Sequence, residues 1–173
     1  MDTCRHAMHI AIDNRQRKFR LHRAALRQVV TALAALASGS RGARPWRELT
    51  VILTDDAGIA PLNHLIMRHE GPTDVISQRY EPLPGEPDGM RGELLVNVER
   101  AWQVGSRRSG WSPSRELALY IAHGCDHLND AEDATSAGRQ RMRRRELRWL
   151  AKIRIPDFAV RASRGSAGRM LSQ

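Results

Sequence analysis

Two histidines and a carboxylate near position 125 have the spacing of a metal site. His123 and His127 lie in a stretch whose apolar residues recur at helical spacing, so both imidazoles are expected on one helix face, one turn apart. That spacing suits two nitrogen ligands on one zinc ion. Asp133 is placed to supply an oxygen ligand once the chain turns back. Three protein ligands and an open position are typical of a catalytic zinc site.

The histidine pair alone is a weak signal, because two histidines at this spacing more often lie on a surface or pack in a core. The apolar setting strengthens it, since a buried imidazole needs a polar partner. Gly124 occupies the position of the glutamate in the H-E-x-x-H motif of zinc proteases, which disfavours a protease. Cys125 points to the other side of the helix and is expected to be a small buried side chain. Two nitrogens and an oxygen also suit nickel, cobalt or manganese.

Asp126 is a candidate catalytic residue with an equally good alternative. It lies three residues after His123, where it could orient a ligand imidazole, or it could be an exposed helix charge. The general base is open at this stage between Asp126, Glu132 and another nearby group, because spacing does not decide.

The elements that must position these residues alternate along the chain, which predicts an α+β fold. We expect one domain with a small mixed sheet of about four strands, about five helices, and the metal site on a central helix. The predicted strands are residues 8–12, 49–53, 73–77 and 93–98. The predicted helices include 18–37, a segment from about 58 to 69 that contains Pro61, one opened by Pro113, and 135–152. Residues 38–45 and 81–91 are rich in glycine and proline and are expected to be loops.

The chain of 173 residues carries 28 Lys plus Arg against 19 Asp plus Glu, a net charge of 28 − 19 = +9. Lys18 and Lys152 are the only lysines, so arginine supplies almost all of the positive charge. Arginine grips phosphate with a planar fork, which favours nucleic acid as a partner and an acidic membrane surface second. A GC-rich genome would give the same composition, so charge alone is weak evidence.

Other features bound the class of protein. Two distant cysteines, Cys4 and Cys125, argue against a disulfide framework and for a cytoplasmic location. No apolar run approaches the roughly 20 residues that cross a bilayer, so no membrane role is expected. The apolar stretch 29–37 imitates a signal peptide, but its spacing favours a core helix. We expect a domain over residues 1–160 and a basic, disordered tail over 161–173.

The sequence resembles the YbeY family of bacterial zinc-dependent endoribonucleases, which act in ribosomal RNA maturation. The family signature is H-G-x-L-H-L-x-G-[YF]-D-H. His123, Gly124, His127 and Leu128 match it, and Asp133 stands where the third family histidine would lie. The resemblance extends over roughly residues 8–155, in the family's order. Further matching segments are 49–56, 62–63, Arg68, 72–77, 92–96 and 142–143.

Several positions depart from the family pattern. Asp126 replaces a leucine, Asp130 replaces a glycine, Glu132-Asp133 replaces the D-H ending, and Gln78 replaces an aromatic residue. Zinc accepts a carboxylate as well as an imidazole, and aspartate tolerates the left-handed turn that glycine would make at position 130. We therefore favour a divergent but active branch over a homologue with weakened metal use.

The resemblance implies a single-strand-specific endoribonuclease that uses a zinc-activated water in rRNA maturation and ribosome quality control, with the small ribosomal subunit as partner. It places Arg68 in the cleft, where it would stabilise the transition state and bind RNA. An arginine run would hold the RNA backbone, although a solvated helix face explains most of its members better. The run contains Arg139, Arg141, Arg143, Arg144 and Arg145.

Two alternatives stay open from the sequence. One is a zinc-stabilised module that binds RNA or the ribosome without catalysis. The other is a metal hydrolase with a different substrate. The oligomeric state is not predicted.

Overall fold

The computed structural model describes residues 8–39, 46–86 and 89–161, in which four strands form a mixed sheet. The order across the sheet is β1-β3-β5-β4. β1, β3 and β5 are parallel, and β4 runs antiparallel along β5. Their bounds are His9–Asn14 for β1, Trp46–Thr54 for β3, Val75–Tyr80 for β4 and Met90–Asn97 for β5. The predicted sheet is confirmed.

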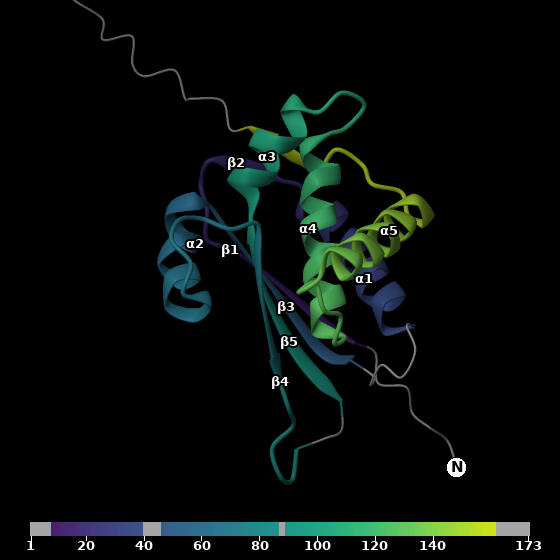
Figure 1. Ribbon diagram of the computed structural model, residues 1–173. Helices are drawn as coiled ribbons and strands as arrows, with labels where there is room; N and C mark the ends of the chain where they lie inside the picture. The colour runs from purple at the N-terminus through teal and green to yellow at the C-terminus, as the bar shows by residue number, and fades with distance from the viewer. Residues whose placement is uncertain (1–7, 40–45, 87–88, 162–173) are drawn as a thin grey trace, which may run out of the picture.

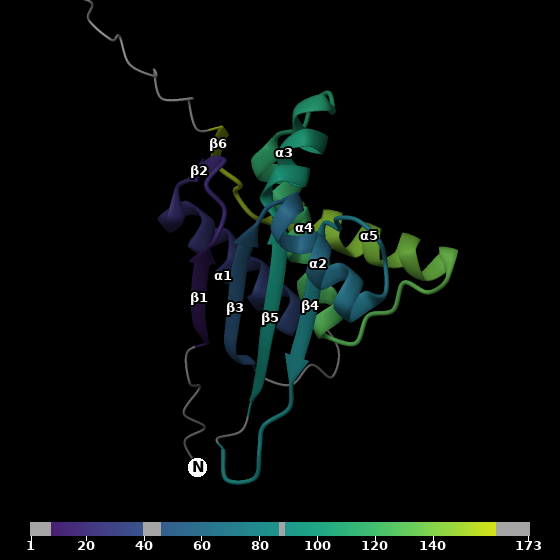
Figure 2. The ribbon, with the colours of Figure 1, turned by 90° about the vertical axis from the view of Figure 1, so that its left-hand side faces the viewer.

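Helices cover both faces of this sheet (Figure 1). α1 (Arg23–Ser38) and α4 (Pro113–Leu128) pack with β3 and β5 in the main core, whereas α2 (Asp56–Leu62) packs on the opposite face. Alternate residues of the buried strands face the two layers: Leu94 lies in the main core and Leu95 lies under α2. Figure 2 shows α2 in front of the sheet and α4 behind it.

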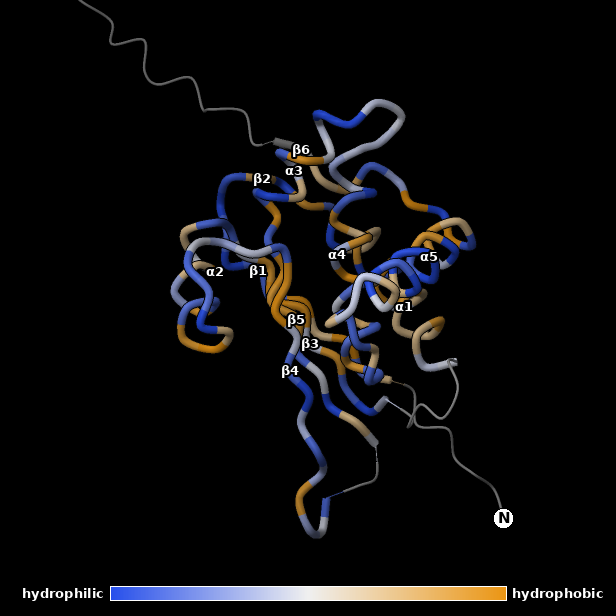
Figure 3. Tube along the Cα trace, in the orientation of Figure 1, coloured by the Kyte–Doolittle hydropathy of each residue, from blue (hydrophilic) through white to orange (hydrophobic). Residues whose placement is uncertain are grey.

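α4 is the central helix that the sequence predicts. It contacts α1, α3 (Val98–Arg107), α5 (Ser136–Lys152), β4 and β5. Ser112 caps its first turn by accepting a hydrogen bond from the Arg115 amide, and Pro113 fits the first helical position. Figure 3 shows the hydrophobic strands β3 and β5 beside this helix, and the more hydrophilic α5 outside it. His123 and His127 therefore stand on the most buried helix in the described part of the chain, and Asp133 lies in the turn that follows it.

The predicted helix over 18–37 is wrong at its start. β2 (Phe19–Leu21) pairs antiparallel with β6 (Ala159–Arg161), and α1 begins only after His22. Gln16 explains the strand, because its buried side chain bonds both the amide and the carbonyl of Phe19. The rest of the segment is a core helix as predicted, and its Val29, Val30 and Leu33 are buried.

The segment around Pro61 also differs from the expected single helix. α2 ends at Leu62 and continues as a π-helical turn, η1 (Asn63–Met67). Arg68 then takes a left-handed conformation with φ 58°, which ends the helix.

The other boundaries shift by smaller amounts. Val98, predicted at a strand end, begins α3 because Asn97 caps that helix. β6 ends at Arg161, the first residue of the predicted tail. The rest of the predicted tail, 162–173, and loop residues 40–45 lie outside the described residues. No helix in the described part of the chain is long and apolar enough to cross a membrane.

Candidate metal centre

Side-chain atoms of His123, His127 and Asp133 converge at the C-terminal end of α4. The two Nε2 atoms lie 3.2 Å apart, and Asp133 Oδ2 lies 3.8 Å from His127 Nε2. One potential ligand atom from each residue lies within 4.8 Å of the others. Ligands of a tetrahedral zinc ion with bonds of about 2.1 Å stand about 3.4 Å apart. The spacing of the three side chains therefore fits one such ion.

The hydrogen bonds of the two rings leave their Nε2 lone pairs free for a metal. His123 Nδ1 lies 2.7 Å from Glu146 Oε1, and His127 Nδ1 lies 3.0 Å from the Ala131 carbonyl oxygen. A carboxylate and a carbonyl only accept hydrogen bonds, so in the neutral rings both protons belong on Nδ1. Two lone pairs then face each other, an arrangement that a cation between them stabilises.

Glu146 is the residue that orients His123. Its side chain extends from α5 and is almost completely buried. Burial lowers the pKa of His123, but the hydrogen bond and charge of Glu146, together with the charges of Asp74 and Asp133, raise it above its ordinary value. A carboxylate behind a ligand imidazole fixes the ring and makes it a stronger donor to a metal.

The sequence analysis missed Glu146, although a signal was present. Met142, Glu146, Trp149 and Leu150 share the buried face of α5. A glutamate on an apolar helix face needs a polar partner, and His123 on the neighbouring helix is that partner.

Asp126 does not have the role expected of it. Both of its oxygens lie 2.9 Å from Arg145 Nε, and Oδ2 lies 2.7 Å from Arg145 Nη2. Burial raises the pKa of Asp126, and the Arg145 pair opposes that rise without cancelling it. This buried ion pair takes up the Asp126 carboxylate, so the structure does not support the prediction that Asp126 orients a ligand or acts as base. Cys125 is buried as expected.

The turn after α4 brings Asp133 back to the histidines. Asp130 has φ 62°, which confirms the left-handed turn expected at this position. Arg79 on β4 holds the Asp130 carboxylate at 2.5 Å. On the other side, Arg139 Nη1 donates to the Asp133 carbonyl oxygen at 2.9 Å. Two arginines thus fix the backbone around the third candidate ligand.

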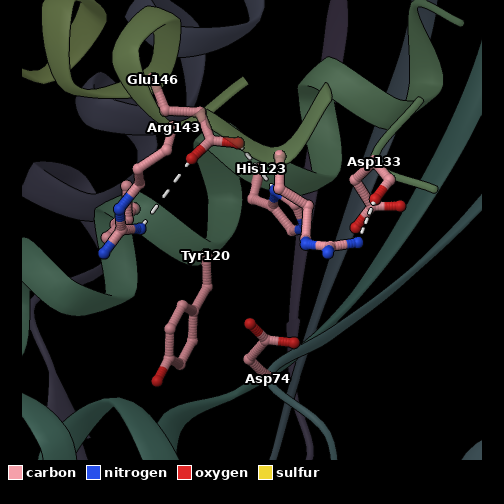
Figure 4. A pocket seen from close by; sticks show the side chains of 8 residues that line it. Asp74, Tyr120, His123, Asp133, Arg143 and Glu146 are labelled. Atoms are coloured by element: carbon pink, nitrogen blue, oxygen red, sulfur yellow. Dashed lines mark hydrogen bonds and ion pairs between the residues drawn. The ribbon is translucent and has the colours of Figure 1, made fainter. Parts of the chain in front are cut away.

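A cavity of about 270 Å³ opens beside His123 and Asp133, between α4 and α5 (Figure 4). Figure 4 shows the Asp74 carboxylate pointing toward the side of the cavity that holds these two residues. Thr73 Oγ1 and the Val75 amide both donate to Asp74 Oδ1, so Oδ2 has no hydrogen-bond partner among the described residues. The residues that line the cavity are Asp74, Leu119, Tyr120, His123, Asp133, Arg139, Arg143 and Glu146.

The arginines predicted to bind RNA fall into different environments. Arg139 and Arg143 line the cavity. Arg145 is held by Asp126, so the prediction that it contacts RNA is not supported. Arg144 bonds Gln140 within its own helix, and Arg141 is exposed outside the cavity.

Arg68 and Glu132 are not brought into the cavity. Arg68 is exposed, is absent from the cavity lining and follows the helix on the opposite face of the sheet. Glu132 is exposed and is absent from the cavity lining. The expectation that Arg68 faces the metal site is therefore not met.

The chain is similar to several known proteins. The family model described as Endoribonuclease YbeY matches residues 11–154 of the chain. A Rhodopirellula baltica protein named Endoribonuclease YbeY is 37% identical over 134 residues; the match covers 77% of this chain and 65% of the relative, just under two thirds of its length.

Two further relatives with the same name are covered almost completely. The Syntrophomonas wolfei protein is 30% identical over 157 residues, which is 86% of this chain and 99% of the relative. The Moorella thermoacetica protein is 30% identical over 154 residues, 84% of this chain and 97% of the relative.

The fold also has a solved counterpart. The solution structure of TM1509 from Thermotoga maritima matches with a TM-score of 0.53 at 19% identity, and the match covers 83% of this chain and 87% of that one. That likeness supports the fold, and the family model and the relatives show the ancestry. The chain belongs to the endoribonuclease YbeY family.

Proposed function

We propose that His123, His127 and Asp133 hold one divalent metal ion, with zinc as the first choice and nickel as an alternative, and that the site cleaves single-stranded RNA. Membership of the endoribonuclease YbeY family makes the chain an endoribonuclease of rRNA processing. We further propose that the protein acts in ribosome quality control in the cytoplasm and that the small ribosomal subunit is its partner. One observation carries the metal site: two Nε2 lone pairs and a carboxylate oxygen converge within 4.8 Å.

The donor set fits a metal ion that acts as a catalyst. When bound, a divalent ion polarises the phosphoryl oxygen and lowers the pKa of water toward about 7. Glu146 holds the His123 ring, and the Ala131 carbonyl holds the His127 ring, so the two imidazole ligands are oriented before any metal binds.

Asp74 is the carboxylate that we propose as general base. The cavity lining contains three carboxylates: Asp133 is a candidate ligand, Glu146 holds His123, and Asp74 keeps one oxygen free. That oxygen would take a proton from the attacking water. Asp126 is paired with Arg145, and Glu132 is exposed outside the cavity, so neither carboxylate lines the space where the water would lie.

Asp74→Asn tests this role. The amide keeps the shape but cannot accept the proton, so cleavage should fall by about 10²- to 10⁴-fold while metal content stays at the wild-type level. Glu132→Gln, an exposed carboxylate outside the cavity, is the matched control and should cleave normally. Full cleavage by Asp74→Asn would remove Asp74 from the mechanism.

Arg143 is the cavity residue best suited to hold the phosphate. Its side chain is 45% exposed, and its only ion pair with a described residue, Glu146, is long at 3.9 Å. The guanidinium can therefore turn toward a phosphate while losing only a weak ion pair. Arg143→Gln should raise KM for RNA, whereas Arg144→Gln, one residue away and outside the cavity, should not. Equal KM values for the two variants would contradict this assignment.

Metal content and cleavage together test the proposed function. Wild type should hold one metal ion per chain and cut single-stranded RNA in preference to duplex RNA, and a chelator should stop the cleavage. His123→Ala should lose both metal and activity. A protein that holds zinc but never cuts RNA would instead be a zinc-stabilised binding module.

A further inference from the structure

A second cavity of about 270 Å³ lies at the opposite end of α4 from Asp133. Arg115, which lines it, precedes His123 by eight residues, about 12 Å along the helix axis at about 1.5 Å per residue. Figure 1 shows the loop between α3 and α4 at this end, away from the turn that follows α4. The lining residues are Gly110, Trp111, Ser112, Arg115, Ile153 and Ile155.

Two guanidinium groups stack on one indole at this cavity. Arg108 Cζ lies 4.2 Å and Arg115 Cζ lies 4.4 Å from the centre of the Trp111 ring. Trp111 Nε1 donates to Glu116 Oε2 at 2.6 Å, which fixes the ring. The Trp111 ring is thus held in place before any ligand binds.

The charges of this cluster do not balance. Glu116 is its one carboxylate, and it lies 3.9 Å from Arg108. Arg115 Nε is shielded from solvent and has no hydrogen-bond partner among the described residues. Two cations against one anion, with a donor left unpaired, suit an anionic ligand. A nucleobase could also stack on these flat cationic and aromatic groups.

The cluster shares a helix face with the metal cavity. Glu116, which holds Trp111, and Tyr120, which lines the metal cavity, are four residues apart on α4 and therefore stand one above the other. Both side chains are almost completely buried, so a strand of RNA that joins the two cavities would pass over the residues that cover them.

We propose that Arg108, Trp111 and Arg115 form a second RNA subsite, which binds one nucleotide about three to four positions from the bond that is cut. The distance follows from about 12 Å along the helix and about 3.4 Å per stacked nucleotide. The arginines bind the phosphate, and the stacked planes bind the base. This subsite rests on the proposed function, because it assumes that the metal cavity holds the scissile phosphate.

Binding of a fluorescent single-stranded dT12 oligonucleotide to the full chain tests the subsite. Trp111→Leu and Arg108→Gln should each raise Kd about five- to tenfold, because each removes part of the stack. Arg108→Gln should also lower the salt slope of binding by about one. Arg107→Gln is the matched control, since Arg107 is a neighbouring exposed arginine outside the stack. Circular dichroism checks the fold of Trp111→Leu, and Arg108→Gln serves if that variant unfolds.

Cleavage assays separate this inference from the proposed function. A 12-nucleotide RNA should be cut less efficiently by Arg108→Gln, whereas a three-nucleotide RNA, too short to reach the subsite, should be cut at the wild-type rate. Unchanged dT12 binding and unchanged 12-mer cleavage in both variants would overturn the subsite and leave the metal site standing. Weakened dT12 binding in Arg108→Gln, in a protein whose wild type never cuts RNA, would refute the proposed cleavage and keep an RNA-binding site here.

Discussion

Glu146→Gln tests whether a buried carboxylate on α5 strengthens the metal site through His123. The wild-type side chain is 1% exposed and lies 2.7 Å from His123 Nδ1. Glutamine can keep the hydrogen bond but removes the charge, so His123 becomes a weaker donor. Loss of such a partner typically lowers metal affinity about 10- to 100-fold, which is about 1.4–2.7 kcal/mol. Charge-assisted hydrogen bonds contribute about 1.5–3 kcal/mol, which agrees with this range.

The assay is a competition titration of zinc against a chromophoric chelator at fixed pH. Glu132→Gln is the control, because it removes the same charge from the exposed turn beside Asp133. The metal-free Glu146→Gln protein should have a free energy of unfolding close to that of wild type, because the glutamine side-chain oxygen can still accept a hydrogen bond from His123 Nδ1. Zinc affinity of Glu146→Gln within twofold of wild type would refute the reasoning, as would an equal loss of affinity in Glu132→Gln.

Three further predictions concern the support of α4. Gly124→Ala should lower the free energy of unfolding in urea by about 1–3 kcal/mol, because a Cβ there would come within 2.6 Å of Leu94 Cδ2. Cys125 should resist iodoacetamide at pH 8 until the protein is unfolded, because burial raises the pKa of its thiol to about 12; mass spectrometry of its peptide reads this out. Arg145→Gln should cost about 3 kcal/mol of stability in urea, because it leaves the Asp126 carboxylate buried without a charge partner.

Each of these has a contradicting result. A Gly124→Ala protein as stable as wild type would show that α4 does not depend on close approach to β5. Rapid labelling of native Cys125 would show that the helix opens readily. For the ion pair, the double variant with Asp126→Asn should recover most of the loss, because it removes the unpaired charge. If the double variant is no more stable than Arg145→Gln, the loss of stability does not come from the unpaired Asp126 charge.

Local patterns in the sequence predicted the parts of the site that depend on one helix and its turn. The four-residue spacing of His123 and His127 placed their rings together because a helix repeats every 3.6 residues. Asp130 was expected in a left-handed turn because aspartate tolerates it, and its φ of 62° confirms this. The ELLVN part of β5 and the buried LTVIL run of β3 were also recognisable, because apolar runs suit strands covered on both faces, but Met90 and Arg91 were expected in a loop and begin β5.

Contacts between distant elements were not predictable in the same way. Glu146 reaches His123 across 23 residues, and Asp74 enters the cavity from β4, so no periodicity links them. The ion pair of Asp126 could not be predicted, because spacing along α4 gives no information about Arg145 on α5. Phe19 fits the apolar face of a helix in spacing, but Gln16 and the pairing with β6 hold it in a strand. Tertiary partners overrode the local pattern in each case.

Zinc content and RNA cleavage, measured together on Asp133→Ala, test the central claim most directly. Wild type should carry one metal ion per chain and cut single-stranded RNA, and Asp133→Ala should lose both while keeping its fold. Stoichiometric zinc with full cleavage in Asp133→Ala would contradict the site built from His123, His127 and Asp133.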